Sequence, residues 1–356
     1  MNVIDLFSGV GGLSLGFEQE GFKVLLAVEK DKDIANSFME NHKFTKMLNE
    51  SIENLNIEKT FKNYKDKIDV IIGGPPCQGF SQKGSRKTIN DSRNFLFKYY
   101  VEVVDYLQPK YFVMENVPNL LTTEKGFFKK EIELLFKNLG YELEIKILNA
   151  ADFGVPQNRR RAIILGKLGN EKLLINPPTL IKKNTIWDAI SDLAFLDSGE
   201  GEFIMDYKFP CKSDYQHLLR GENKVLYNHI ATKHSDIALK RLKLIPAEGS
   251  KEFLPKEELT KSIYSGTWSR MKKDEISVTI TTRFDTPASG KFTHPFLNRA
   301  ITVREAARLQ SFPDNFIFYG SKTSQMKQVG NAVPPILAKY LAKIIKEDML
   351  KINGGN

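Results

Sequence analysis

The chain has 356 residues, of which 41% are hydrophobic and 27% are charged, an ordinary composition for a protein that folds around an apolar core. No apolar run is long enough to span a membrane, no signal peptide is visible, and two cysteines make a poor disulfide framework, which together favour a cytoplasmic protein. The net charge of +9 favours a polyanionic partner, and nucleic acid is one candidate.

The first half of the chain alternates between short apolar runs and amphipathic stretches. Strands are predicted by the apolar runs at residues 3–7, 22–28, 68–72, 111–114, 142–148 and 162–165. Helices are predicted at residues 13–19, 31–41, 94–107 and 127–139, the second of them capped by Asp31. Strands separated by helices of this length predict an α/β fold with a doubly wound, mostly parallel sheet.

The second half is less regular. Residues 184–274 show no pattern that predicts helices or strands, and regularity returns at 277–282, in a helix at 303–310 and in a helix at 335–351. Between residues 207 and 243, eight Lys or Arg residues face three Asp or Glu. This basic stretch is either a solvated helical face or a surface that follows phosphates.

A glycine-rich turn follows the first predicted strand, in the sequence DLFSGVGG at residues 5–12. Such a turn lets a ligand approach the backbone at the carboxyl edge of a sheet, although the dinucleotide pattern G-x-G-x-x-G is absent. Glu29 follows the second strand, where a carboxylate can accept hydrogen bonds from both ribose hydroxyls. The two features together favour a nucleoside ligand.

Cys77 lies in the sequence GGPPCQGFS, directly after the third predicted strand. A cysteine in a loop at a sheet edge can act as a nucleophile through its thiolate, or it can simply fill the turn as a small apolar residue. Glu115 follows the strand 111–114, and a run of arginines at 159–161 precedes the strand 162–165. Since parallel strands end at one edge, we expect the acid, the cysteine and the glycine-rich turn to converge there.

Together these segments resemble the DNA (cytosine-5) methyltransferases over nearly the whole chain. The P-C-Q, E-N-V and Q-x-R-x-R motifs occur here in the family's order. The similar segments are residues 5–12, Glu29, and residues 74–81, 115–117, 157–161, 299–313 and 328–335.

The resemblance implies a reaction and assigns residues to it. Cys77 would add to C6 of a flipped cytosine, and Glu115 would hold the base at N3 and its exocyclic amine. Arg161 would contact the base carbonyl, and Arg159 would help to position the base and Cys77. The activated C5 would then take a methyl group from S-adenosylmethionine, giving S-adenosylhomocysteine, with no metal required.

The resemblance also implies the cofactor site. Its methionine side is expected at Phe7, Gly9, Gly11, Gly12 and Leu13, its ribose at Glu29, and a returning C-terminal segment at Asn331, Ala332 and Val333. Pro75 is expected to shape the pocket wall. In the family, the residue that contacts adenine is usually an Asp followed by Ile. This chain has Ser51 and Ile52 at these positions. Asn49 or Glu50 is the candidate to replace the Asp in its contact with adenine.

The expected partner is double-stranded DNA. Family resemblance makes residues 81–93 a loop that closes over DNA, with phosphate contacts from Ser81, Lys83, Arg86 and Lys87. An ordinary exposed basic loop is the alternative. A target-recognition domain is expected at residues 181–330, including a supporting segment at 277–313, and a catalytic domain at 1–180 plus 331–356. Base contacts are expected from residues of the recognition domain: Arg220, Asn223, Asn228 and Arg270.

Three other functions are weighed against this one. A nicotinamide-dependent dehydrogenase would need G-x-G-x-x-G and has no use for Cys77. A related transfer-RNA methyltransferase typically carries Cys-Phe-Thr, whereas Cys211 precedes Lys212 and Ser213. A non-catalytic DNA-binding protein is expected to have lost one of the catalytic residues. The length is similar to that of bacterial and phage modification enzymes, so a restriction endonuclease is a plausible functional partner. A monomer is expected because the mechanism needs only one chain for each flipped base.

Overall fold

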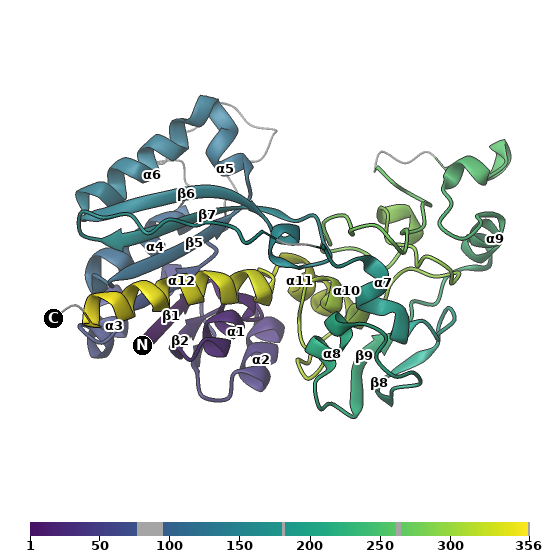
Figure 1. The fold of residues 1–356 in the computed structure, drawn as a ribbon, viewed down its shortest axis with the longest axis horizontal. Helices are drawn as coiled ribbons and strands as arrows, with labels where there is room; N and C mark the ends of the chain where they lie inside the picture. The colour runs from purple at the N-terminus through teal and green to yellow at the C-terminus, as the bar shows by residue number, and fades with distance from the viewer. Residues whose placement is uncertain (77–94, 180–181, 261–264, 355–356) are drawn as a thin grey trace. The chain divides into compact units, whose positions relative to one another are not determined.

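The computed structural model describes residues 1–76, 95–179, 182–260 and 265–354, and the chain divides into two compact units (Figure 1). The first unit comprises Met1–Asn149, Arg160–Thr179 and Pro335–Asn356. The second comprises Ala150–Arg159 and Leu180–Pro334. Both units are therefore built from segments that are far apart in the sequence.

A seven-stranded sheet forms the centre of the first unit, in the order β3-β2-β1-β4-β5-β7-β6. Its strands are β1 (Asn2–Leu6), β2 (Lys23–Val28), β3 (Lys46–Leu48), β4 (Val70–Gly73), β5 (Tyr111–Asn116), β6 (Tyr141–Asn149) and β7 (Arg160–Leu168). Strands β1 to β5 pair in parallel, and β7 runs antiparallel between β5 and β6. The predicted fold class, a mostly parallel α/β sheet, is confirmed, whereas the three-residue strand β3 was not predicted.

Helices of the first unit connect and cover these strands. They are α1 (Gly12–Gln19), α2 (Lys32–Asn41), α3 (Ile57–Phe61), α4 (Phe95–Leu107), α5 (Asn119–Thr122), α6 (Phe127–Asn138) and α12 (Pro335–Gly354). The predicted cap of α2 is confirmed, because the Asp31 carboxylate accepts hydrogen bonds from the backbone N–H groups of Asp33 and Ile34.

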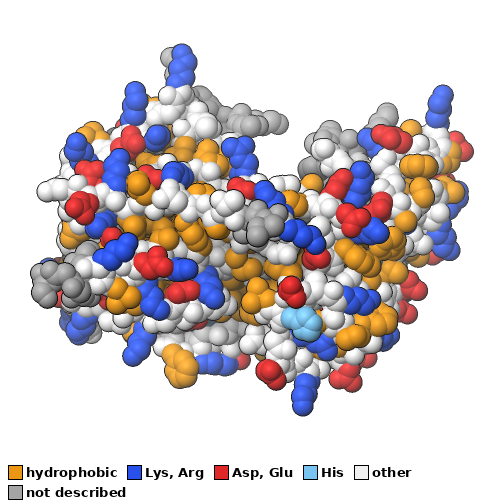
Figure 2. All heavy atoms as spheres, viewed as in Figure 1, with side chains coloured by type: hydrophobic (Ala, Val, Ile, Leu, Met, Phe, Trp, Pro, Cys, Tyr) orange, Lys and Arg blue, Asp and Glu red, His pale blue; other side chains and the backbone are white. Residues whose placement is uncertain are grey.

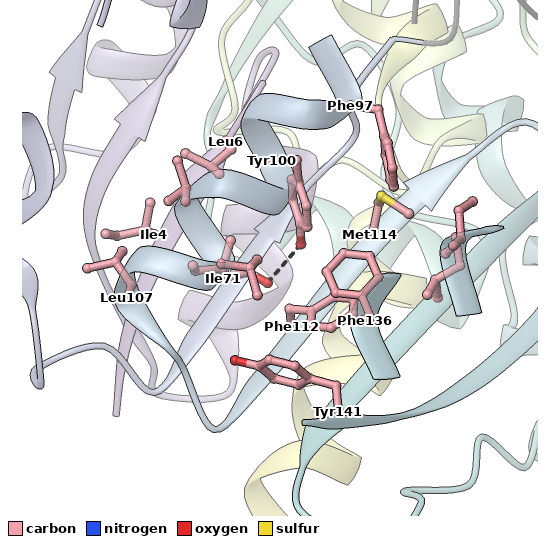
Figure 3. Packing of buried hydrophobic residues seen from close by; sticks show 14 of the residues in the cluster. Ile4, Leu6, Ile71, Phe97, Tyr100, Leu107, Phe112, Met114, Phe136 and Tyr141 are labelled. Atoms are coloured by element: carbon pink, nitrogen blue, oxygen red, sulfur yellow. Dashed lines mark hydrogen bonds between the residues drawn. The ribbon is translucent and has the colours of Figure 1, made fainter. Parts of the chain in front are cut away.

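One face of the sheet packs against α3, α4 and α6 through a large apolar cluster. Ile4 and Leu6 of β1 belong to this cluster, and Phe112 of β5 stacks on Phe136 of α6 with ring centroids 4.2 Å apart (Figure 3). The hydroxyl of Tyr100 donates hydrogen bonds to backbone carbonyls of the sheet. Because side chains alternate along a strand, Asp5 points to the opposite face, where its carboxylate meets Ser14 of α1.

On that opposite face, α1 packs against α12, which Figure 1 shows in yellow. Gly16 makes the close approach possible, because a Cβ atom there would lie 2.4 Å from the Cβ of Ala338. The segment that begins at Pro335 is thus an integral part of the first unit.

The second unit contains short helices and a hairpin. Its elements are α7 (Ile186–Ile190), β8 (Gly201–Asp206), α8 (Asp214–Arg220), β9 (Val225–Ile230), α9 (Asp236–Leu244), α10 (Val303–Leu309) and α11 (Lys322–Asn331), with β8 and β9 antiparallel. The sequence predicted no regular elements in residues 184–274, although five of these lie there. At 277–282 it predicted regular structure, whereas Ser277 makes only an isolated bridge to Gln157. The predicted helices at 303–310 and 335–351 are confirmed as α10 and α12.

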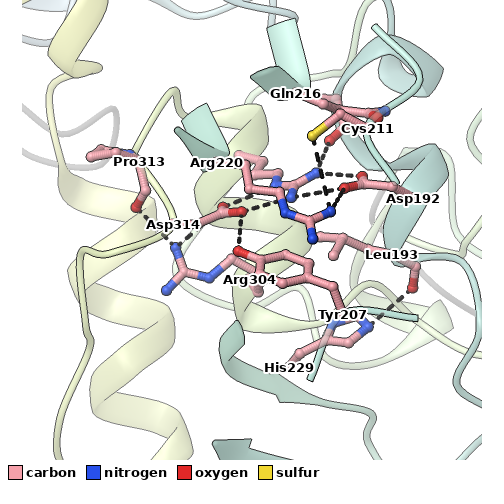
Figure 4. A network of polar contacts seen from close by, with 12 residues as sticks. Asp192, Leu193, Tyr207, Cys211, Gln216, Arg220, His229, Arg304, Pro313 and Asp314 are labelled. Atoms are coloured by element: carbon pink, nitrogen blue, oxygen red, sulfur yellow. Dashed lines mark hydrogen bonds and ion pairs between the residues drawn. The ribbon is translucent and has the colours of Figure 1, made fainter. Parts of the chain in front are cut away.

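Buried arginines organise the core of the second unit. Arg308 of α10 binds the carboxylates of both Asp192 and Asp314, and all three side chains are fully buried. Figure 4 labels the two aspartates within their network of polar contacts. Arg299 forms a second buried pair with Glu305 at 2.8 Å. Arg304 donates to the backbone carbonyls of three different residues. The conspicuous run RAITVREAARLQSFP at 299–313 thus supplies internal ion pairs, since a buried charge is tolerated only when paired.

Positive charge is dispersed over the face of the molecule that Figure 2 shows. On the face shown in Figure 2, Lys and Arg side chains are interspersed with Asp and Glu side chains, so on this face the net charge of +9 is not one continuous patch. No helix in the described part of the chain is long and apolar enough to cross a membrane.

Candidate active site

The glycine-rich turn after β1 has an unusual backbone. Phe7, Gly9 and Gly11 all have positive φ angles, of 57°, 55° and 93°. A Cβ atom at Gly11 would lie 2.2 Å from Nε2 of His42, so the left-handed backbone and the close packing both require glycine there. At Gly9, by contrast, a Cβ atom would have no described atom within 4 Å. The turn therefore fixes the start of α1 and, as far as the described residues go, leaves the space beside Gly9 unfilled.

Glu29, directly after β2, is tied to this turn. Its Oε2 accepts a hydrogen bond from the backbone N–H of Gly9 at 3.0 Å, and its Oε1 accepts one from Asp31 at 2.8 Å. Burial raises the pKa of Glu29 above its ordinary value, and these hydrogen bonds counteract the rise. The structure thus brings together the predicted ribose acid and the predicted methionine-side loop.

The segment predicted to contact adenine follows β3. Ser51 is half-buried and donates its hydroxyl to Glu53, whereas Ile52 is only 3% exposed and packs in the core of the sheet. Asn49 donates its side-chain amide to the backbone carbonyl of Glu29 at 2.9 Å. Asn49 therefore connects this segment to the Glu29 turn, and the adenine contacts of Ser51 and Ile52 stay predictions.

Glu115 and Arg161 form an ion pair at the carboxyl edge of the sheet. The Nε atom of Arg161 lies 2.8 Å from Oε1 of Glu115, and the two side chains are 15% and 12% exposed. The pair forms because β5 and β7 are antiparallel, with Asn116 opposite Ala162, so that the beginning of β7 lies beside the end of β5. The Q-x-R-x-R motif thus reaches the same edge as the E-N-V motif.

The loop that leads to Cys77 begins beside this pair. Asn116 donates its side-chain amide to the backbone carbonyl of Pro75 at 2.8 Å. A Cβ atom at Gly74 would lie 3.1 Å from Oε2 of Glu115, so the absence of a side chain keeps the loop close to the carboxylate. Cys77 itself lies outside the described residues, and so do the predicted phosphate contacts Ser81, Lys83, Arg86 and Lys87.

Arg159 has a different setting, inside the second unit. It is fully buried and donates to the backbone carbonyls of Ile280, at 3.2 Å, and Gly330, at 2.8 Å. Gln157, two residues earlier, accepts a hydrogen bond from Ile280 and donates to Gln310. Arg159 thus anchors the polypeptide two residues before Arg161, and its predicted role near the base stays a prediction.

The other predicted contacts also belong to the second unit. Asn331 ends α11 and is exposed, whereas Ala332 and Val333 are 9% and 6% exposed. Their approach to the cofactor stays a prediction. Arg220 stacks on Tyr207, 3.5 Å from its ring centroid, and donates to the carbonyl of Phe209.

Arg270, predicted to contact DNA, is used inside the fold. It is 2% exposed, and all five of its N–H donors are engaged: four by backbone carbonyls and one by the side chain of Asn298. Asn228 is likewise buried and exchanges two hydrogen bonds with the backbone of Phe318. Base contacts by Arg270 or Asn228 would require these bonds to break.

The sequence analysis assigned no separate role to two residues near the carboxyl edge of the sheet. Asn116 was noticed only as part of the E-N-V motif, and Asp5 only as the first residue of the glycine-rich segment. The detectable signal for Asp5 was a carboxylate inside an otherwise apolar strand. Among the described residues, no cluster of His, Cys, Asp or Glu could hold a metal ion.

Known proteins are similar to this chain in sequence and in fold. The profile of the C-5 cytosine-specific DNA methylase family matches residues 1–347. The chain belongs to this family. It is a DNA (cytosine-5-)-methyltransferase, of a family that uses S-adenosylmethionine.

Several methyltransferases are similar to this chain over most of their length. The type II methyltransferase M1.HphI of Haemophilus parahaemolyticus is 38% identical, with 99% of this chain and 87% of that protein covered. M.DdeI of Desulfomicrobium norvegicum is 36% identical, with 100% and 92% covered. A solved structure of a putative DNA modification methyltransferase encoded within an E. coli prophage superimposes with a TM-score of 0.80 at 31% identity, covering 98% of this chain and 99% of that one.

Proposed function

We propose that this methyltransferase modifies C5 of one cytosine within a short specific sequence of double-stranded DNA, and so protects the DNA from a partner restriction endonuclease. The Glu115–Arg161 ion pair beside the loop that leads to Cys77 is the observation that supports the proposal, because an acid and a guanidinium side by side suit the polar edge of a cytosine. The names of the similar type II methyltransferases support the restriction-modification role. Such an enzyme works in the cytoplasm, and one chain suffices for each flipped base.

The proposed reaction begins at Cys77. Its thiolate adds to C6 of the cytosine, which breaks the C5–C6 double bond and moves the electron pair towards C5 while N3 is held by Glu115. C5 would then form a bond to the methyl group as the bond from that methyl group to the sulfur of its donor breaks. Loss of the C5 proton to a base expels the thiolate and restores the ring. The cytosine must leave the helix first, because C5 and C6 are shielded within the base stack.

Arg161 and Asn116 would prepare this site. Arg161 holds one oxygen of Glu115, which leaves Oε2 of Glu115 on the side of Gly74. The same guanidinium can reach the base carbonyl, as the family resemblance suggests. Asn116 fixes Pro75, two residues before Cys77. The three side chains would thus set the acid and the nucleophile relative to each other before the base arrives.

The residues of the glycine-rich turn fit the cofactor. No described atom lies within 4 Å of a Cβ built at Gly9, Glu29 presents a carboxylate held by two backbone N–H groups, and the buried carboxyl of Asp5 has one oxygen without a hydrogen-bond partner among the described residues. When bound, S-adenosylmethionine supplies an electrophilic methyl group on a positively charged sulfur. Glu29 would accept the ribose hydroxyls, and the turn from Phe7 to Leu13 would hold the methionine side.

The decisive experiment is methyl transfer to unmethylated genomic DNA, read by bisulfite sequencing. Protection of cytosines in one short motif supports the proposal and identifies the target. Cys77→Ser should abolish the transfer, while Cys211→Ser is the matched control, because Cys211 is the other cysteine and burial raises the pKa of its thiol. Absence of protection by a folded protein that binds the cofactor would reject the DNA substrate, and the same assay on RNA would then test the related RNA activity.

A further inference from the structure

Asp5 is a buried acid directly beneath the glycine-rich turn. It lies in β1, two residues before Phe7, and is 0% exposed. The hydroxyl of Ser14 donates to its Oδ2 at 2.7 Å, whereas Oδ1 is buried and has no hydrogen-bond partner among the described residues. A carboxylate in such surroundings is poorly solvated, because one hydroxyl replaces the several donors that water would supply.

The charged groups around Asp5 are also acidic. Glu29, after β2, and Glu18, on α1, both act on it by like-charge repulsion, and Tyr100 of α4 is the third titratable group within range. Glu18 is itself paired with His42, whose Nδ1 lies 2.7 Å away. Burial is the main cause that raises the pKa of Asp5, to about 8, and the charges of Glu29 and Glu18 add to the rise. The hydrogen bond from Ser14 opposes it. In the free protein near neutral pH, Asp5 is therefore mostly a neutral acid.

The two forms of the cofactor differ in charge at one atom. S-adenosylmethionine has a positively charged sulfur, and S-adenosylhomocysteine has a neutral thioether. In a site shielded from water, a positive charge strongly favours the ionised form of a nearby acid. Asp5 is a buried acid with a pKa of about 8, and it lies in the strand that leads into the predicted methionine-side loop.

We propose that Asp5 distinguishes cofactor from product by charge: it releases its proton when S-adenosylmethionine binds at the glycine-rich turn, and takes a proton back when methyl transfer leaves the neutral thioether. The proposal rests on the proposed function in one respect, that the cofactor binds at this turn. The step is balanced: neutral Asp5 and the positively charged sulfur of S-adenosylmethionine give an ionised Asp5 beside that sulfur, and one proton passes to solvent. Asp5 would then favour binding of the cofactor and release of the product.

The experiment is calorimetric binding of S-adenosylmethionine and S-adenosylhomocysteine, in buffers of different ionisation enthalpy, so that released protons are counted. At pH 7 the wild-type protein should release up to one more proton than Asp5→Asn on binding S-adenosylmethionine, and no more than Asp5→Asn on binding S-adenosylhomocysteine. The difference between the two proteins cancels the titration of the ligands themselves. Equal proton release by both proteins would overturn the proposal.

The preference between the ligands should also depend on pH. The preference is the affinity for S-adenosylmethionine divided by the affinity for S-adenosylhomocysteine. Between about pH 6.5 and 8 this ratio should rise more steeply in the wild type than in Asp5→Asn. The difference is at most about tenfold per pH unit, which is the limit for one proton. Asparagine has the shape of the neutral acid, so Asp5→Asn is expected to fold. A preference that changes with pH identically in both proteins contradicts the inference.

A second variant keeps the test decisive if Asp5→Asn does not fold. Ser14→Ala removes the hydroxyl that stabilises the ionised form, so proton release and the pH-dependent preference should shift to higher pH. Ser37→Ala is the matched control, since Ser37 is another buried serine but donates to a backbone carbonyl. No shift relative to Ser37→Ala overturns the proposal. A wild-type protein that binds neither ligand would overturn both this inference and the cofactor site, whereas binding without differential proton release overturns only the inference.

Discussion

The guanidinium of Arg161 and the carboxylate of Glu115 face each other across two antiparallel strands, with Nε and Oε1 2.8 Å apart. Arg161 is supplied by the one strand that runs against its neighbours, so its position at the start of β7 coincides with the end of β5. An antiparallel strand in an otherwise parallel sheet thus brings a cation to the edge where the acids lie.

Replacing Arg161 should impair chemistry rather than cofactor binding. We expect Arg161→Ala to lower kcat by about 100-fold or more, as for the loss of one positioned donor to a reacting group. Arg161→Lys should be intermediate, because lysine keeps the charge but loses the planar fork. Arg160→Ala is the control, since its side chain is exposed. A normal kcat in Arg161→Ala would remove Arg161 from the base site.

Asn116 should influence catalysis by holding the loop that leads to Cys77. Asn116→Asp keeps the shape but loses the donor to the Pro75 carbonyl, so we expect at least a tenfold loss of kcat with unchanged cofactor affinity. In a Cys211→Ser background, Cys77 is the only thiol, and its alkylation rate by iodoacetamide should change in the same variant. An unchanged alkylation rate and an unchanged kcat would show that the hydrogen bond has no part in positioning Cys77.

Two glycines of the same turn should behave differently. Gly11→Ala should destabilise the fold by about 3 kcal/mol or more, because a clash with His42 adds to the penalty for a left-handed residue. Gly9→Ala should cost only about 1–2 kcal/mol, since no described atom crowds its Cβ. If the cofactor fills that space, Gly9→Ala should nevertheless weaken its binding more than tenfold. Calorimetry and urea unfolding separate the two effects, and normal cofactor affinity in Gly9→Ala would place the cofactor elsewhere.

The stability of the cofactor-free protein should respond to Asp5. Its folded pKa of about 8 lies above the ordinary 3.8, so between these values the folded state binds more protons than the unfolded state. The free energy of unfolding should therefore fall as pH rises from about 4 to 8, by at most about 1.4 kcal/mol per pH unit from this group. Urea unfolding at pH 5, 6.5 and 8 should show Asp5→Asn gaining stability over the wild type as pH rises. A constant difference would refute the prediction.

Arg308 should be critical for the second unit. Arg308→Met leaves Asp192 and Asp314 buried without their principal cation and should cost about 3–5 kcal/mol. Arg283→Met is the control, because that arginine is exposed and its surface pair contributes at most about 1 kcal/mol.

The ion pair between Arg308 and Asp314 should also determine how strongly low pH destabilises the second unit. Burial alone would raise the pKa of Asp314, but Arg308 outweighs it and lowers the value to about 2. Its contribution is thus present above the ordinary pKa of 3.8 and is lost as pH falls towards 2. Unfolding curves at pH 2, 3 and 4 should show less acid sensitivity in Arg308→Met than in the wild type.

Sequence reasoning predicted the sheet well because its strands are apolar runs bounded by turns. It missed β3, since three residues are too short to show alternation, and it missed the antiparallel direction of β7, which no local pattern encodes. In β8, alternate residues are exposed and none is buried, so the apolar periodicity that marks a strand is weak.

The candidate site was predictable where motifs specify chemistry, as for Glu29, Glu115 and Arg161, which lie at the expected sheet edge. It was less predictable for arginines of the second unit. Arg270 looks like a DNA-binding residue in sequence, yet its five donors all serve the fold. Whether an arginine is buried depends on carbonyls supplied by distant segments, such as Leu242 and His294, and a single sequence does not show which ones converge.

The packing of α12 on α1 has a consequence for how the protein is made. Residues 335–354 leave the ribosome after the whole second unit, yet they cover a face of the unit that was begun first. Domains generally fold as they emerge, but here the nascent sheet must wait with the α1 face uncovered while 155 intervening residues, Leu180–Pro334, are synthesised. Completion of the first unit therefore waits for α12, which is among the last parts of the chain to be synthesised.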